Sequence, residues 1–310
     1  MAKIGTSSLD VFPLCLGGNV FGWTADEEQS RAVLDAYVAA GGNFIDTADA
    51  YSAWAPGHTG GESETILGRW MADRANRDSI VIATKVGMLP NLRGLTARTV
   101  RAAAEGSLRR LRTDRIDLYY AHVDDAATPL EETLTEFDAL VREGKVRYIA
   151  ASNYKAPRLA EALATSERLG LARYVALQPH YNLVHRDEYE DGLATLCARE
   201  RLACFPYSAL ASGFLSGKYR PGGKVESARA GNAAKYLDER GLRILAALDA
   251  IAVERRTTVA AVSLAWLRTR PAVVAPIASA RTPEQLAELL PFVSMRLTDD
   301  EVAALNAASA

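Results

Sequence analysis

Short apolar segments alternate with longer amphipathic segments along almost the whole chain. Eight of the short segments are rich in Val, Ile, Leu, Ala and Tyr, and they cover residues 14–18, 43–46, 80–85, 115–122, 146–152, 174–178, 202–207 and 272–277. Strands joined through helices pair in parallel, because each helix carries the chain back to the starting edge of the sheet. Eight such units within 310 residues predict an α/β protein folded as a (β/α)8 TIM barrel.

Two segments fall outside this repeat. Residues 3–12 are typical of a short N-terminal β-hairpin ahead of the first barrel strand. Residues 208–236 form a Gly/Ser/Lys/Arg-rich loop, followed by two extra helix-like segments before the last strand; loops of this length are usually functional. We expect a single barrel domain over residues 1–310. A doubly wound dinucleotide fold would instead require a GxGxxG motif, which the chain lacks.

Four threonines predict helix starts, because each is followed three residues later by Glu or Gln in the pattern of a capping box. The pairs are Thr24 with Glu27, Thr128 with Glu131, Thr282 with Gln285, and Thr298 with Glu301.

Composition narrows the class of protein. The net charge of -2 does not favour nucleic acid or an anionic membrane as a partner, and no apolar run is long enough to span a bilayer. The N-terminus lacks the apolar core of a signal peptide. An odd number of cysteines without a CxxC motif predicts a reduced, cytoplasmic protein with packing cysteines at Cys15, Cys197 and Cys204.

Polar residues end most of the predicted strands. The second, third and fourth strands end at Asp46, Lys85 and His122, and Tyr51 lies on the loop after the second strand. The later strands end at Ser152 and Asn153, Gln178 and Tyr207. Because active sites of such barrels lie at the carboxyl ends of the strands, these side chains are expected to meet.

The residue types indicate proton transfer to an oxygen. A tyrosine pKa near 10 makes a sluggish acid, and we expect the Lys85 ammonium, held by Asp46, to lower the pKa of Tyr51. Tyr51 would then protonate a carbonyl oxygen that His122 orients. The matching hydride cannot come from a side chain, whereas a nicotinamide cofactor can supply it.

Each of these four residues also has a structural interpretation. Asp46 could cap a turn, and Lys85 could be a solvated charge. His122 could be a core histidine, and Tyr51 could be a packing residue. Their joint occurrence at consecutive strand ends favours one site over four coincidences.

At these residues the chain resembles the aldo-keto reductase superfamily. The motifs are "GGNFIDTADAY", "IATKVG", "DLYYAH", "IAASNY", "LQPHYNL" and "PYSALASGFLSGKY", and the resemblance runs from "LGGNVFG" to "RTPEQLAE". It implies a (β/α)8 barrel that reduces carbonyls with NADPH. The family's catalytic tetrad falls on Asp46, Tyr51, Lys85 and His122.

The resemblance also implies a path for NADPH. Tyr207 would stack on the nicotinamide ring, and Arg281, just before a helix start, would bind the 2′-phosphate of the adenosine. The other implied cofactor contacts are Gly18, Asn19, Val20, Ser152, Asn153, Gln178, Ser208, Leu210, Ser212, Gly213, Leu215, Lys218, Ser279, Gln285 and Glu288. Leu289 departs from the family pattern, in which many members have asparagine against the adenine.

We expect Trp23, Trp54 and Met88 to form the walls of the substrate pocket, with His58 near them. We expect the substrate to be a small carbonyl compound, and an aldehyde, ketone, dicarbonyl or sugar-derived carbonyl would fit. A metal-dependent hydrolase is disfavoured because no HxH or HExxH spacing occurs. A Schiff-base aldolase would need an uncharged Lys85. A regulatory subunit resembling the potassium-channel β subunits shares the tetrad and remains the alternative.

Overall fold

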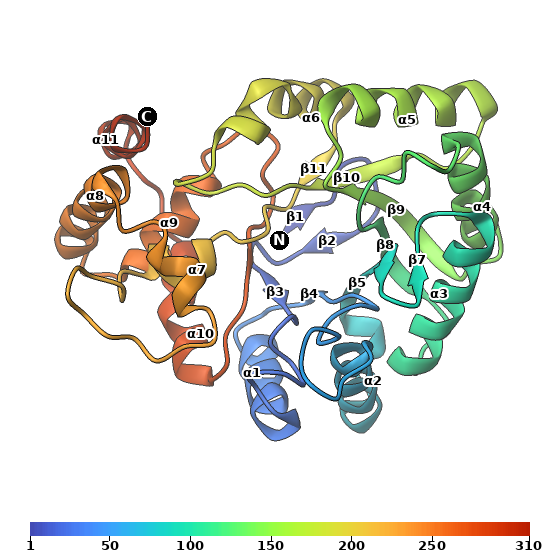
Figure 1. Cartoon of the computed structure of the whole chain (residues 1–310), viewed down its shortest axis with the longest axis horizontal. Coiled ribbons are helices and arrows are strands. Elements are labelled where there is room, and N and C mark those ends of the chain that lie inside the picture. Colours follow the sequence, from blue (N-terminus) through green and yellow to red (C-terminus); the bar gives the residue numbers. More distant parts are fainter.

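The computed structural model describes residues 1–310, and its main sheet curls into a barrel surrounded by helices (Figure 1). The eight parallel strands, in their order around the sheet, are β11 (Ala203–Cys204), β10 (Tyr174–Gln178), β9 (Val146–Ser152), β8 (Ile116–Ala121), β5 (Val81–Val86), β4 (Phe44–Asp46), β3 (Cys15–Gly17) and β12 (Ile277–Ala278). A bridge between Cys204 and Val273, and a hydrogen bond from the Ile277 amide to the Pro206 carbonyl at 2.9 Å, close the ring. The predicted barrel is therefore confirmed.

The last two strands are shorter than the sequence predicts. The eighth strand was expected at 272–277, but regular pairing with β3 is confined to Ile277 and Ala278. The seventh was expected at 202–207, and β11 covers only two residues. Pro276 and Pro206 lie in these segments, and a proline has no amide hydrogen to donate to a sheet.

Eleven α-helices surround the strands. They are α1 (Glu27–Ala39), α2 (Glu62–Arg74), α3 (Ala97–Leu111), α4 (Leu130–Arg142), α5 (Ala156–Leu169), α6 (Ala194–Glu200), α7 (Ala230–Ala234), α8 (Glu239–Arg255), α9 (Val259–Leu267), α10 (Pro283–Leu289) and α11 (Asp299–Ala308). The helices α8 and α9 are the two extra helices predicted before the last strand, whereas α7 is a short helix within the predicted loop; all three gather on one side of the barrel (Figure 1).

The helix starts match the sequence only in part. Thr298 and Glu301 form the predicted capping box of α11, and the Thr282 side chain accepts a hydrogen bond from the Gln285 amide. The expectation for α1 was wrong, because Asp26, with Gln29, forms its capping box. At α4 the predicted box is also absent. The Thr128 hydroxyl instead donates to Asp125 at 2.7 Å.

The predicted N-terminal hairpin consists of β1 (Ala2–Lys3) and β2 (Asp10–Val11), and it lies over the centre of the ring (Figure 1). Its apolar side chains Ile4, Leu9 and Val11 are buried in the cluster that fills the barrel, together with residues such as Phe44 and Phe205. The hairpin therefore closes the amino-terminal end of the barrel, and the loops that follow the strands surround the other end. A second hairpin, β6 (Met88–Leu89) with β7 (Leu92–Arg93), follows β5.

Candidate active site

Strand periodicity explains why polar strand ends point to one place. Side chains two apart in a strand face the same side of the sheet. Phe44, Ala83 and Tyr120 fill the barrel interior, so the residues two positions later, Asp46, Lys85 and His122, continue on the inner side at the carboxyl ends. The same two-residue spacing applies to the next strands. Ser152, Gln178 and Tyr207 each follow a residue of the barrel interior by two positions, so they also face inward.

Lys85 is the centre of a buried hydrogen-bond cluster. Its Nζ atom donates to Asp46 Oδ2 at 2.7 Å, to the Thr47 carbonyl at 2.8 Å and to the Tyr51 hydroxyl at 2.7 Å. These acceptors occupy all three hydrogens of an ammonium group. The Tyr51 hydroxyl itself donates to Asp46 Oδ2 at 2.9 Å, and Gln178 donates to the other oxygen, Oδ1, at 2.8 Å. The arrangement favours a charged Lys85 and disfavours a Schiff-base lysine.

Burial dominates the electrostatics of this cluster. It raises the pKa of the Tyr51 phenol well above its usual value, and the charge of Asp46 acts in the same direction. Burial also lowers the pKa of Lys85, while Asp46 opposes that shift. The expectation that Lys85 would bring the pKa of Tyr51 below its ordinary value was therefore wrong for the protein alone, because desolvation disfavours a phenolate more than the expectation allowed.

His122 lies beside the cluster as a neutral ring. The centroids of the Tyr51 and His122 rings are 6.2 Å apart. Burial, aided by the charge of Lys85, lowers the pKa of His122 well below its usual value. Its Nδ1 atom is buried without a hydrogen-bond partner. A neutral imidazole can donate one hydrogen bond without bringing a second cation into the site.

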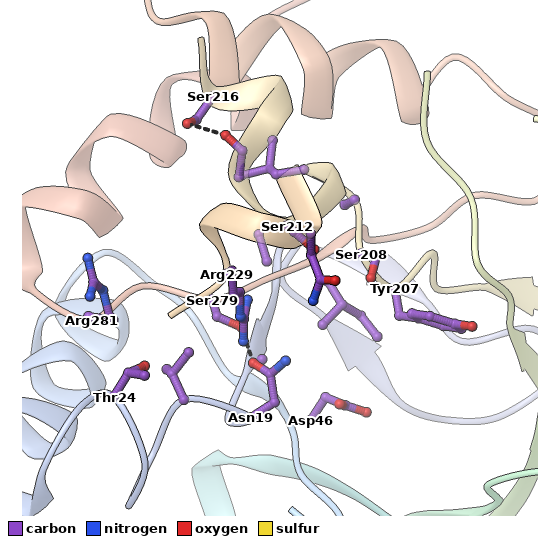
Figure 2. Close-up of a pocket in the computed structure, with 18 of the residues that line it drawn as sticks. Asn19, Thr24, Asp46, Tyr207, Ser208, Ser212, Ser216, Arg229, Ser279 and Arg281 are labelled. Atoms are coloured by element: carbon purple, nitrogen blue, oxygen red, sulfur yellow. Dashed lines mark hydrogen bonds between the residues drawn. The ribbon is translucent and has the colours of Figure 1, made fainter. Parts of the chain in front are cut away.

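The cluster opens into a cavity of about 1030 Å³. Of the residues expected in the site, those that line it are Asn19, Val20, Trp23, Asp46, Tyr51, Trp54, Met88, His122, Ser152, Asn153, Gln178, Tyr207, Ser208, Leu210, Ser212, Gly213, Lys218, Ser279, Arg281, Gln285 and Glu288. Figure 2 places Arg281 and Tyr207 at opposite ends of this lining, with Asn19 between them.

Three residues of the expected tetrad and cofactor path do not line the cavity. Lys85 lies beneath it, fully buried. Leu215 is fully buried in the core, and its carbonyl accepts a hydrogen bond from Ser263. Gly18 packs on the end of β4, where its amide donates to the Asp46 carbonyl at 2.7 Å. A β-carbon on Gly18 would come within 3.0 Å of that carbonyl oxygen, so glycine is needed there for close packing.

Hydrogen bonds fix several lining side chains. Asn153 donates to the His122 carbonyl at 2.8 Å and accepts from the Tyr207 hydroxyl at 2.8 Å. The Ser279 hydroxyl donates to Asn19 Oδ1 at 2.6 Å, which joins the loops after β12 and β3. At the far end, the Gln285 side chain accepts from the Arg281 amide at 3.0 Å. The polar lining is thus held in place by the protein itself.

Sequence reasoning missed several lining residues. Arg229 is the main one: its guanidinium lies 5.6 Å from the centre of the Trp23 ring, and Figure 2 shows its side chain near Ser279 and Asn19. The other lining residues that were not singled out are Gly17, Thr24, Ala209, Ser216, Gly217, Ser227, Ala228, Asn232, Ala260, Ile277 and Ala278. Leu289, named above for its departure from the family pattern, also lines the cavity. The only signal for Arg229 was its place in the long loop after β11. That loop contains several other arginines and lysines, and the sequence does not show which of them reaches the cavity.

The three residues expected to wall the substrate pocket all line the cavity. The Trp23 and Trp54 rings pack edge to face with centroids 5.4 Å apart, and the Tyr51 ring lies 6.1 Å from Trp54. The Trp54 and Met88 residues are 51% and 46% exposed, so apolar surface is available to a ligand. His58, expected nearby, is not part of the lining.

The fold and the cluster define a (β/α)8 barrel with a polar site at the carboxyl ends of its strands. A family model described as Aldo/keto reductase family matches residues 13–310, and the chain belongs to this family of oxidoreductases. No group of three or more His, Cys, Asp or Glu residues is arranged to hold a metal ion. No helix is long and apolar enough to cross a membrane.

Relatives with different names share about a third of the sequence. Norsolorinic acid reductase stcV of Emericella nidulans is 33% identical over 96% of this chain and 78% of its own length. Protein tas of Escherichia coli is 33% identical over 98% of this chain and 96% of its own. A probable voltage-gated potassium channel subunit beta of Oryza sativa is 33% identical over 92% of this chain and 88% of its own.

Proposed function

We propose that the protein is an NADPH-dependent oxidoreductase that reduces aldehydes or ketones to alcohols, with Tyr51 as the proton donor. The observation that carries this proposal is the position of the Lys85 ammonium, 2.7 Å from both the Tyr51 hydroxyl and Asp46 Oδ2, at the inner end of the cavity. When bound, the reduced nicotinamide supplies the hydride that the carbonyl carbon receives.

The residues of the cavity fit such a cofactor. Neutral hydrogen-bonding groups, among them Ser152, Asn153 and Gln178, surround the end that holds the tetrad. The aromatic face of Tyr207 lies beside them, and Lys218, Arg229 and Arg281 supply positive charge to the rest of the lining. A ligand with a flat polar ring at one end and phosphates along its length matches this distribution.

Tyr51 performs the proton transfer in this scheme. Its high pKa keeps the phenol protonated while the substrate binds. The hydroxyl then turns from Asp46 toward the carbonyl oxygen and gives up its proton as negative charge develops on that oxygen. The Lys85 ammonium remains hydrogen-bonded to the phenolate that is left and stabilises it. Asp46 holds the ammonium in place, and the neutral His122 ring donates to the carbonyl oxygen.

The variant Tyr51→Phe tests the proposal, because it removes the hydroxyl and keeps the ring. Turnover of a panel of aldehydes and ketones, followed by the absorbance of the reduced cofactor, should fall by roughly 100- to 10,000-fold. Binding of NADPH, measured by fluorescence titration, should change little. Tyr119→Phe is the matched control, since it removes a buried hydroxyl bonded only to the Val100 carbonyl, outside the cavity. Near-normal turnover by Tyr51→Phe would remove the proton-donor assignment.

A regulatory subunit is the second candidate, and the similarity to the probable potassium channel subunit beta of rice favours it. Such a protein would bind the cofactor through the same cavity but turn over slowly. Wild-type protein that binds NADPH tightly and reduces none of the carbonyl panel would support this candidate over the enzyme.

A further inference from the structure

Three aromatic rings stack in a row that begins at the cavity wall. Tyr207 lines the cavity. Behind it the His180 ring lies nearly parallel, with centroids 5.2 Å apart and an angle of 16° between the planes. The His185 ring stacks on His180 with centroids 3.9 Å apart and an angle of 15°. Neither histidine lines the cavity, so the stack supports Tyr207 from the side away from any ligand.

A tight turn after β10 builds this stack. His180 forms a parallel bridge with Tyr207, and the Tyr207 amide donates to the Pro179 carbonyl at 2.9 Å. Asn182 and His185 then exchange backbone hydrogen bonds of 3.1 and 3.0 Å, which fold the chain back and lay the second histidine on the first. The Asn182 side chain accepts from the Val184 amide at 2.9 Å, which closes the turn from within.

The turn is also fastened to its surroundings. The Asn182 amide group donates to the Ser208 carbonyl at 2.9 Å, next to Tyr207 in the chain. The Arg240 guanidinium, from α8, donates to the Val184 carbonyl at 3.1 Å. These bonds connect the stack to the loop after β11 and to the outer helices. The histidine turn is therefore hydrogen-bonded to the backbone next to Tyr207.

Burial, aided by nearby charge, keeps the inner ring of the stack, His180, neutral. Burial, followed by the charges of His185 and Lys235, lowers the pKa of His180 to about 4, although Glu188 opposes the shift. His180 is therefore uncharged at physiological pH. The outer His185 is partly exposed, and its Nε2 atom lies 3.2 Å from Glu188 Oε2. A neutral ring can lie flat against the phenol without placing a cation behind it.

We propose that His180 and His185 are positioning residues that hold the Tyr207 ring flat against the cavity, so that it is already oriented to stack on the nicotinamide ring of the cofactor. The Tyr207 hydroxyl is fixed by Asn153 at 2.8 Å and one ring face is covered by His180, which leaves the opposite face for the ligand. A pre-oriented platform binds more tightly because less freedom is lost when the ligand binds. This inference rests on the proposed function for the identity of the ligand.

Three variants of His180 separate stacking from simple space filling. His180→Phe keeps a flat ring, His180→Leu keeps bulk without a plane, and His180→Ala removes both. Fluorescence titration with NADPH should give dissociation constants roughly three- to tenfold higher for the Leu and Ala variants, the range expected for one lost aromatic pair. The Phe variant should bind like wild type. The turnover number at saturating NADPH should stay within about twofold in all three, because the tetrad is untouched.

A ligand-independent measurement keeps this inference distinct from the proposed function. Crystal structures of wild type, His180→Phe and His180→Leu should show Tyr207 in one ring orientation in the first two, and displaced or in two orientations in the third. If wild type binds no nicotinamide nucleotide, the proposed function fails while the crystals still decide the role of the stack. An ordered, unshifted Tyr207 in His180→Leu, or equal NADPH affinities for the Leu and Phe variants, would overturn the inference.

Discussion

Asp49 is a buried acid that the proposed reaction does not use. It lies in the loop between β4 and α2, is fully buried, and neither carboxylate oxygen has a hydrogen-bond partner. The adjacent Glu64 is better satisfied, since it accepts from Thr84 and from Arg110, both at 2.6 Å. Burial raises the pKa of Asp49 from 3.8 to about 7, and the charge of Glu64 adds to the rise.

The raised pKa of Asp49 makes the free energy of unfolding depend on pH in a definite direction. An acid whose pKa is raised by folding binds its proton more tightly in the folded state, so stability falls as pH rises from the unfolded value to the folded value. The two pKa values therefore differ by about 3. At 1.36 kcal/mol per unit, ionised Asp49 costs roughly 4 kcal/mol once the pH exceeds its folded pKa. The charges of Arg110 and Lys85 oppose the rise, so the cost would be larger without them.

Asp49→Asn should remove this pH dependence, because the amide has the same shape and cannot ionise. The free energy of unfolding is measured with urea at several pH values for the variant and for wild type. The difference, variant minus wild type, should increase by roughly 3 kcal/mol between about pH 5 and about pH 8.5. Asp187→Asn, at an exposed position, is the control and should show no such trend. A difference between Asp49→Asn and wild type that stays constant across this range would refute the reasoning.

Two further perturbations test the far end of the cavity and the packing of the barrel. Arg281→Ala should weaken binding of NADPH much more than NADH in fluorescence titrations, because only NADPH carries the 2′-phosphate; equal weakening would count against that contact. Gly68→Ala drives a β-carbon into the Arg110 carbonyl oxygen and should lower the free energy of unfolding by roughly 1–3 kcal/mol or more. Gly231→Ala, whose β-carbon meets nothing within 4 Å, is its control; equal urea midpoints for the two variants would contradict the packing argument.

Local pattern predicted the parts of the fold that depend on near neighbours in the chain. The strand segments, the N-terminal hairpin and the α11 capping box all follow from periodicity or from contacts across a few residues. The predictions of strand length and of the first helix cap were wrong where a nearby residue favoured another local structure. Prolines shortened β11 and β12, and Asp26 formed the cap expected from Thr24.

Several features of the site required the tertiary structure. Arg229 reaches Trp23 from a loop more than 200 positions later in the chain, and no spacing rule encodes that approach. The stack of His180 and His185 behind Tyr207 depends on a turn held by Ser208 and Arg240.

The sequence by itself determined which residues end the barrel strands and which side of the sheet they face, because the two-residue period of a strand is a local property. Strand period and strand order were therefore enough to place Asp46, Lys85 and His122 together. The tertiary structure decided how deeply they are buried. Desolvation depends on everything packed around a group, so the direction of the Tyr51 pKa shift and the unpartnered state of Asp49 follow only from the packing of the whole folded chain.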